Sequence, residues 1–184
     1  MKYLKPVNFY QEFFKDILIK KDYSKPGRLL DLDVSDKYVS LAVSDWKNLT
    51  AVPLSRALDR QENNLSPMAA DLFQSLIPEH NLVGFVFGTN YGREDSRPVN
   101  AQTKIFIDDL CKTGKVEGLK YTFWDRGITS KNAEFVLKQH LEFLLENFNL
   151  PQSMSKTTLE KCQAVSALQG YLDITNKMVN EDWD

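Results

Sequence analysis

Two aspartates separated by a single residue are the first chemically suggestive feature of the sequence. Asp31 and Asp33 lie in a stretch from Leu30 to Ser35 where apolar and polar residues alternate, as in a half-buried β-strand. Residues two apart on a strand project from the same face, about 6.5–7 Å apart along the chain. Mg²⁺ and Mn²⁺ prefer carboxylate and water oxygens, and such ions can hold the oxygens of a phosphodiester during its hydrolysis. The alternative interpretation is a strand whose solvent-exposed face carries two acids.

A third acid, Glu160, also allows two interpretations. Thr157 and Glu160 have the spacing of a capping box, in which the glutamate satisfies the N-cap amide of the last helix. Glu160 also lies four and eight residues before Ala164 and Leu168, at the start of the helix face expected to pack on a sheet. A carboxylate at that position would point toward the strand ends. The sequence leaves both interpretations open.

The elements that must position these acids form a mixed α/β domain. Hydrophobic periodicity predicts five strands, at about 30–35, 39–43, 50–54, 82–87 and 119–124, and four helices, at about 66–77, 100–112, 130–147 and 158–178. The first two strands form an antiparallel hairpin, and Pro53 places the third at a sheet edge because proline lacks an amide donor. Right-handed crossovers make the first, fourth and fifth strands parallel. We therefore expect the strand order 3-2-1-4-5, with helices on both faces.

Polar and flexible residues follow the three parallel strands at the points where they end. Asp31 and Asp33 belong to the first strand, the fourth ends at 88–90 (Gly-Thr-Asn), and the fifth ends at 125–127 (Asp-Arg-Gly). The carboxyl ends of parallel strands share one sheet edge, and ligands of open α/β sheets bind there. The sequence therefore predicts the functional site at this edge.

The two ends of the chain differ in character from the middle. We predict that residues 1–26 form an N-terminal extension with an amphipathic helix over about 8–20, that 27–178 form the main domain, and that 179–184 form an acidic tail. The extension has acids and no arginine, whereas organellar transit peptides are arginine-rich and acid-poor. A cytoplasmic location is therefore the expectation.

The composition is that of a single globular domain. The chain has 184 residues, 42% hydrophobic residues and a formal net charge of −2, so it lacks the strongly basic character of many nucleic-acid binders, although a local basic patch is compatible with it. Its two cysteines are too few for a disulfide framework, which favours a reducing compartment. Its longest apolar run is too short for a membrane helix, so no membrane partner is expected.

Three blocks of sequence resemble the YqgF family, also called RuvX. The segment 27–45 resembles the family's opening motif G-R-x-L-G-x-D-x-G-x-K followed by A-x-S-D, and 124–130 resembles its D-E-R-x-T-T/S segment. The stretch from 160 to 173 resembles its last helix, so the resemblance covers about 27–176. The short N-terminal extension resembles that of the plant-like branch of the family.

The resemblance implies a ribonuclease-H-like fold and an activity on nucleic acid. The family contains predicted Holliday-junction resolvases and nucleases that mature the precursor of small-subunit ribosomal RNA. Its three acidic site residues fall on Asp33, Arg126 and Glu160 of this chain, so one of the three is replaced by a permanent cation. An arginine there takes the place of a metal-binding carboxylate and is able to pair with Asp33 or Asp31.

Two functions are consistent with these features. The first is a metal-dependent nuclease whose active site is partly degenerate and which acts on structured RNA, ribosomal precursors above all, or on branched DNA. Such a site would hold one Mg²⁺ or Mn²⁺ weakly, or none. The second is a catalytically inactive family member that binds RNA or a ribosome-assembly partner. The oligomeric state, monomer or homodimer, is left open.

The candidate site residues fall into three groups. The catalytic candidates are Asp33, Glu160 and Asp125, and the candidate metal ligands are Asp33, Glu160 and Asp31. The candidates for nucleic-acid contacts are Arg28, Lys37, Arg126, Asn90 and Arg93.

Overall fold

The computed structural model describes residues 1–15, 27–35, 38–54, 58–59, 65–89, 101–126 and 163–181, together with positions 135, 138, 139 and 142. The strands are β1 (Lys2–Tyr3), β2 (Arg28–Val34), β3 (Tyr38–Ser44), β4 (Ala51–Pro53), β5 (Leu58–Asp59), β6 (Leu82–Thr89) and β7 (Lys120–Asp125). The helices are α1 (Pro6–Tyr10), the π-helical turn η1 (Gln11–Lys15), α3 (Leu65–His80), α4 (Ala101–Lys112) and α7 (Gln163–Glu181). The helix expected over 130–147 and the expected start of the last helix lie outside the described residues, apart from four isolated positions.

All the described strands form one mixed sheet with the order β1-β7-β6-β2-β3-β4, and β5 pairs with β3 outside this path. The five expected strands are β2, β3, β4, β6 and β7, and their predicted order and the edge position of the Pro53 strand are confirmed. The expected number of strands was too low, because the sheet has seven. The two additional strands, β1 and β5, have two residues each, which is too short for an alternating pattern to reveal them.

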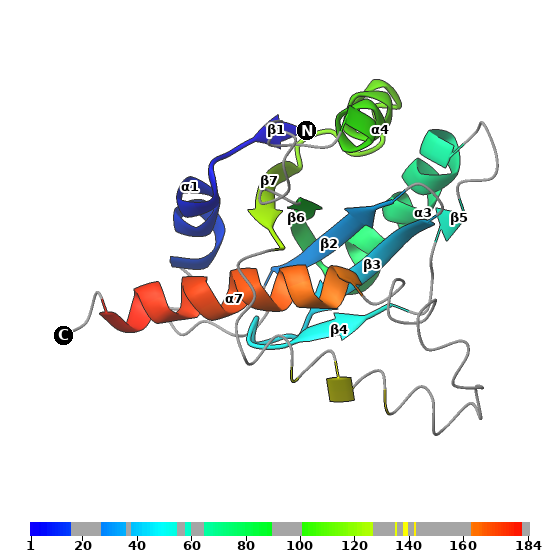
Figure 1. Ribbon diagram of the computed structural model, residues 1–184. Helices are drawn as coiled ribbons and strands as arrows, with labels where there is room; N and C mark the ends of the chain where they lie inside the picture. Colours follow the sequence, from blue (N-terminus) through cyan, green and yellow to red (C-terminus); the bar gives the residue numbers. More distant parts are fainter. Residues whose placement is uncertain are drawn as a thin grey trace.

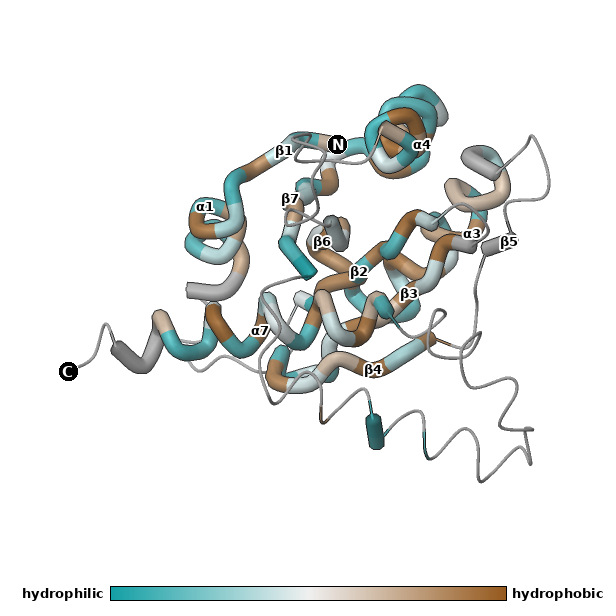
Figure 2. Tube along the Cα trace, in the orientation of Figure 1, coloured by the Kyte–Doolittle hydropathy of each residue, from teal (hydrophilic) through white to brown (hydrophobic). Residues whose placement is uncertain are grey.

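Helices cover both faces of the sheet, with α7 across one face and α3 and α4 against the other (Figure 1). Side chains of β2 alternate between the two faces: Leu30, Leu32 and Val34 pack toward α3 and α4, and Leu29 packs toward α7. Figure 2 shows hydrophobic and hydrophilic positions following one another along β2. Asp31 and Asp33 share the parity of Leu29 and therefore lie on the α7 face.

The N-terminal segment is packed into this fold. Strand β1 adds in parallel to the outer side of β7, and Phe9 of α1 is fully buried in the core beneath α7. The Phe9 ring fills the space above Gly84 of β6, where a built Cβ would lie 2.6 Å from Phe9 Cζ. The helix begins at Pro6, two residues before the start of the expected helix over 8–20, because proline is well suited to the first helical turn.

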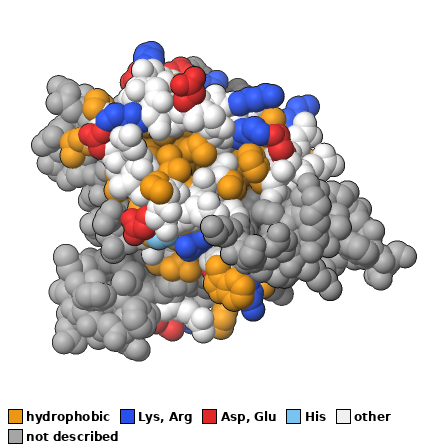
Figure 3. Space-filling view, turned by 180° about the vertical axis from the view of Figure 1, so that it is seen from behind, with side chains coloured by type: hydrophobic (Ala, Val, Ile, Leu, Met, Phe, Trp, Pro, Cys, Tyr) orange, Lys and Arg blue, Asp and Glu red, His pale blue; other side chains and the backbone are white. Residues whose placement is uncertain are grey.

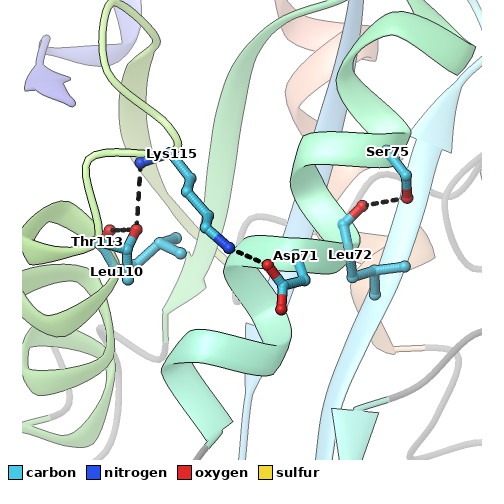
Figure 4. Close-up of polar contacts among 6 residues, drawn as sticks. All are labelled: Asp71, Leu72, Ser75, Leu110, Thr113 and Lys115. Carbon is cyan, nitrogen blue, oxygen red and sulfur yellow. Dashed lines mark hydrogen bonds and ion pairs between the residues drawn. The ribbon is translucent and has the colours of Figure 1, made fainter.

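A short connection after α4 ties the second helical layer together (Figure 4). Lys115 reaches from this connection to Asp71 of α3, and Thr113 Oγ1 donates a hydrogen bond to the carbonyl oxygen of Leu110, 2.6 Å away. Gly114 and Gly118 have φ of +71° and +83°, left-handed conformations that favour glycine, and the chain turns through them before β7 begins at Lys120. These contacts hold the connection that leads into β7 against α3.

None of the described helices is both long enough and apolar enough to cross a bilayer.

Candidate nucleic-acid site at the carboxyl edge of the sheet

The two aspartates of β2 are buried beneath α7. Asp31 is fully buried and Asp33 is 2% exposed. Asp31 lies between Ala42 of β3 and Val86 of β6, and Asp33 lies opposite Ser40 of β3. The interpretation of a solvent-exposed acidic face is therefore wrong. Central strands of a sheet covered by helices on both faces have no exposed face. Polar residues that alternate with apolar ones in such a strand are therefore buried.

Arg126 reaches Asp33 of β2 from the end of β7, although β7 and β2 are not neighbouring strands. Arg126 follows β7, its amide donates to the carbonyl oxygen of Thr89 on β6 (2.8 Å), and β6 separates it from β2. The side chain crosses β6 above Gly88, where a built Cβ would lie 3.4 Å from Arg126 Cδ and 3.3 Å from Ala167 Cβ. The absence of a side chain at Gly88 opens the path for the guanidinium.

The guanidinium of Arg126 joins the sheet to the first turn of α7. Its Nη1 donates to Asp33 Oδ2 at 2.8 Å and to Gln163 Oε1 at 2.8 Å. The arginine side chain is 20% exposed, so the ion pair is largely shielded from solvent. The pairing of Arg126 with Asp33 that the sequence suggested is thus present, and it closes the crevice between β2, the end of β7 and α7.

Two buried carboxyl groups share a single neighbouring guanidinium, which contacts Asp33. Among the described residues, neither oxygen of Asp31 has a hydrogen-bond partner, and Asp33 Oδ1 has none either. Burial raises the pKa of the Asp31 carboxyl well above its usual range, and the neighbouring Asp33 raises it further, while Arg126 acts in the opposite direction. Burial also raises the pKa of Asp33, and Arg126 lowers it. The Asp31 carboxyl therefore holds its proton more tightly than an exposed aspartate does.

Other candidates lie apart from this pair. Asp125 is the last residue of β7. Side chains alternate along a strand, so Asp125 shares the face of Phe123, which packs toward α3 and α4, whereas Asp33 lies on the α7 face. Arg28 lies at the other end of β2, where its Nε donates to the carbonyl oxygen of Ser44 at 2.6 Å. Four further candidates, Glu160, Lys37, Asn90 and Arg93, lie outside the described residues. Their roles stay predictions, as do those of Asp125 and Arg28.

Gln163 is a site residue that the motif analysis did not single out. It is the first described residue of α7 and accepts the hydrogen bond from Arg126. A signal for it was present, because the helix expected over 158–178 places Gln163 three residues after Glu160, on the same face. The contact also shows that the first described turn of α7 lies close to Asp33.

The family resemblance implies a divalent metal ion, and the side chains around Asp33 decide whether such an ion fits. In the described part of the chain, no three acidic, histidine or cysteine side chains gather in a group able to hold a metal. The unpartnered oxygens of Asp31 and Asp33 are suitable donors, but a fixed cation already contacts Asp33 at 2.8 Å. As placed, Arg126 and these carboxylates do not fit a divalent ion, because the ion would be repelled at the same position.

The crossing of Arg126 above Gly88 yields a stability prediction. The Gly88→Val variant should lose about 1–3 kcal/mol of unfolding free energy, because its methyl groups overlap Ala167 and the Arg126 stem. Urea unfolding measures this loss. The Gly88→Ala variant is the matched control and should lose much less. In an Arg126→Ala background the cost of Gly88→Val should shrink, and an undiminished cost would show that Arg126 does not use this path.

This combination of a mixed sheet, buried aspartates at the strand ends and a helix closing over them defines an α/β domain with a polar crevice at its carboxyl edge. A family model described as "RuvX: Holliday junction resolvase" matches residues 27–174. The chain belongs to the RuvX family. The match begins after the N-terminal segment that packs beneath α7.

Curated bacterial relatives and solved structures are also similar to the chain. Proteins named "Putative pre-16S rRNA nuclease" are 27% identical over 150 residues in Lachnospira eligens (82% of this chain, 99% of the relative) and 29% identical over 154 residues in Caldicellulosiruptor saccharolyticus (81% and 99%). A structure titled "T. thermophilus RuvC in complex with Holliday junction substrate" aligns with a TM-score of 0.47 and 9% identity, over 80% of this chain and 95% of that one.

Proposed function

We propose that this chain is a RuvX-type nuclease of structured RNA, with precursors of ribosomal RNA as the substrate class, and that the Arg126–Asp33 pair makes its hydrolysis slow. The Arg126 contact to Asp33 at 2.8 Å is the observation that supports the attenuated activity. Support for the substrate class comes from the family match and from the printed names of the bacterial relatives. We place this function in the cytoplasm, in line with the cysteine usage of the chain.

The residues of the crevice have separate tasks in this proposal. Arg126 lies at the carboxyl edge of the sheet with its side chain 20% exposed, and an arginine fork binds a phosphate oxygen well. Asp33 and Gln163 hold the guanidinium in place when no nucleic acid is bound. Asp31 supplies the buried carboxyl behind them.

A second function, unattenuated metal-dependent cleavage, has one observation in its favour. Three carboxylate oxygens of Asp31 and Asp33 have no partner in the described part of the fold. These oxygens would serve as ligands of a divalent ion if Arg126 leaves Asp33 when nucleic acid binds. Glu160 would then be the third acid. The inactive binding protein is the limiting case of the proposed function, in which Arg126 never leaves.

The proposal is tested with a ribosomal RNA precursor fragment and the purified full chain in Mn²⁺. We expect measurable binding in a gel-shift assay together with slow or absent cleavage. Fast cleavage by the wild type would support the second function, with Asp31 taking over the missing role. Failure to bind either the RNA fragment or a four-way DNA junction would overturn the proposed function.

A further inference from the structure

The turn between β3 and β4 exposes two large apolar side chains. In this turn, Asp45–Thr50, Trp46 is 56% exposed and Leu49 is 49% exposed. The turn lies at the opposite end of the sheet from Asp33, because β3 is antiparallel to β2 and ends beside the start of β2. The crevice does not use these residues, so their exposure calls for a separate explanation.

The turn is held rigidly by its own backbone and by Asp45. Asp45 Oδ1 accepts hydrogen bonds from the amides of Leu49 (2.7 Å) and Thr50 (3.1 Å). The Asn48 amide donates to the Asp45 carbonyl oxygen at 3.0 Å, and Asn48 has a φ of +53°, a conformation that asparagine tolerates. The conformation that presents Trp46 is therefore set before any partner binds.

Two distant parts of the chain reinforce the same turn. Asn48 is buried, accepts a hydrogen bond from Ser44 Oγ at 2.6 Å and donates to the Gly27 carbonyl oxygen at 2.9 Å. From α7, Gln169 Nε2 donates to the Leu49 carbonyl oxygen (2.9 Å) and Asn176 Nδ2 donates to the Asn48 carbonyl oxygen (3.0 Å). A preorganised surface loses little conformational entropy on binding, which favours a binding role for the exposed tip.

The charges around the tip favour an anionic partner. Lys47 Nζ lies 4.7 Å from the centroid of the Trp46 ring, and Lys177 is exposed one residue after the Asn176 that contacts the turn. The one acid of the turn, Asp45, points its carboxylate back to the backbone amides. Lys47 lies over one face of the exposed indole. An exposed indole with a cation next to it is able to stack a nucleic-acid base on its other face and to contact the neighbouring phosphate. Figure 3 shows that Lys, Arg, Asp and Glu side chains are interspersed around the hydrophobic ones on the face turned away in Figure 1.

The neighbouring strand edge is closed to a peptide. The amide of Ala51 on β4 donates to Gln169 Oε1 at 2.8 Å, and Pro53 has no amide hydrogen. Strand addition needs a row of free donors and acceptors, which β4 does not offer. Side-chain stacking on Trp46 is therefore the mode of binding that the geometry supports.

We propose that Trp46 is a base-stacking site for single-stranded nucleic acid, with Lys47 and Lys177 contacting the flanking phosphates. This inference rests on the proposed function and extends its footprint from the crevice to the other end of the sheet. The two places are separated by at least the length of β2 from Arg28 to Asp33, five residues at about 3.3 Å each, or roughly 17 Å. Such a site would hold a single-stranded flank of a structured RNA whose cleavage position lies in the crevice.

The test is fluorescence anisotropy of the full chain with a fluorescein-labelled oligouridylate and with the ribosomal RNA precursor fragment. Trp46→Ala should weaken oligouridylate binding by about 5- to 150-fold, the range for loss of one stacked base. Trp46→Phe should retain most of the affinity. Leu49→Ala is the matched control, since it removes an equally exposed apolar side chain of the same turn that cannot stack. Lys47→Ala should lower the slope of log affinity against log salt by about one.

The outcomes separate this inference from the proposed function. If the wild type binds the precursor fragment and Trp46→Ala binds the oligouridylate equally well, the stacking site is wrong while the proposed function stands. If the wild type binds neither probe, both fail. Trp46→Ala and Leu49→Ala could lose oligouridylate affinity equally, and sedimentation could show a wild-type dimer that both variants dissociate. Together these results would identify the turn as an interface between copies and overturn the stacking site. Unchanged thermal unfolding of Trp46→Ala confirms that the variant is folded.

Discussion

Replacing Arg126 by glutamate should convert the crevice from a site that repels divalent ions into one that binds them. The change reverses the local charge by two units and adds a carboxylate beside Asp33 and Asp31, whose free oxygens are already in place. We expect Mn²⁺ affinity to rise at least tenfold, which corresponds to about 1.4 kcal/mol or more. Isothermal titration of the wild type and the Arg126→Glu variant measures the difference directly.

The same variant should become dependent on metal for its stability. Without Arg126, Asp33 keeps a buried charge with no partner, and breaking a fully buried ion pair costs about 3–5 kcal/mol. The cost here should be smaller, because the Arg126 side chain is 20% exposed. We therefore expect the melting temperature of Arg126→Glu to fall in chelator and to recover in Mn²⁺, since a ligand that binds only the folded state stabilises it.

Arg126→Gln is the matched control, since it removes the cation without supplying a ligand. It should lose stability without a comparable gain in Mn²⁺ affinity. Equal gains in both variants would show that charge removal alone is sufficient, and that position 126 is not a ligand position. Tight binding of two ions by the wild type would contradict the poor fit of Arg126 and these carboxylates to a divalent ion, and would mean that Asp31 has taken over the role of the missing acid.

Replacing Asp31 by asparagine should stabilise the protein at high pH and make its stability less dependent on pH. The folded-state pKa of Asp31 lies well above the value of an unfolded chain, chiefly because of burial and secondarily because of Asp33. The favourable contribution of the protonated carboxyl is thus complete below about pH 4, the unfolded pKa, and is lost as pH rises through the folded pKa. Above that point the folded protein contains a buried carboxylate without a donor.

The size of the effect follows from the cost of an unsatisfied buried group, about 1–3 kcal/mol, or a few degrees in melting temperature for a chain of this size. Thermal unfolding of the wild type and Asp31→Asn between pH 5 and pH 9 measures it, with the advantage of the variant growing toward pH 9. Asp108→Asn on the exposed surface of α4 makes the same chemical change without burial and should show no such trend. A wild type whose stability rises steadily over this range would contradict the expectation.

The architecture was largely predictable from local pattern. Strands β2, β3, β6 and β7 are long enough for alternation or a continuous apolar run to mark them, and the crossover rule then determines their order. The edge position of β4 follows from Pro53 alone. By contrast, β1 is defined by hydrogen bonds to β7, such as the one from the Leu4 amide to the Tyr121 carbonyl oxygen at 2.9 Å. A two-residue strand has no period, so only its partner reveals it.

The chemical character of the site was decided by the tertiary structure. The sequence by itself determined that Asp31 and Asp33 share a face and that Arg126 comes to the same sheet edge, because side-chain parity and strand order are local properties. It did not determine that this face is buried, since burial depends on α7, which lies more than a hundred residues further along the chain. The contact of Arg126 with Gln163 and the anchoring of the 45–50 turn by Gln169 and Asn176 depend on the same packing. Burial by α7 turns two ordinary acids into a coupled, poorly solvated pair, and no pattern within β2 contains that information.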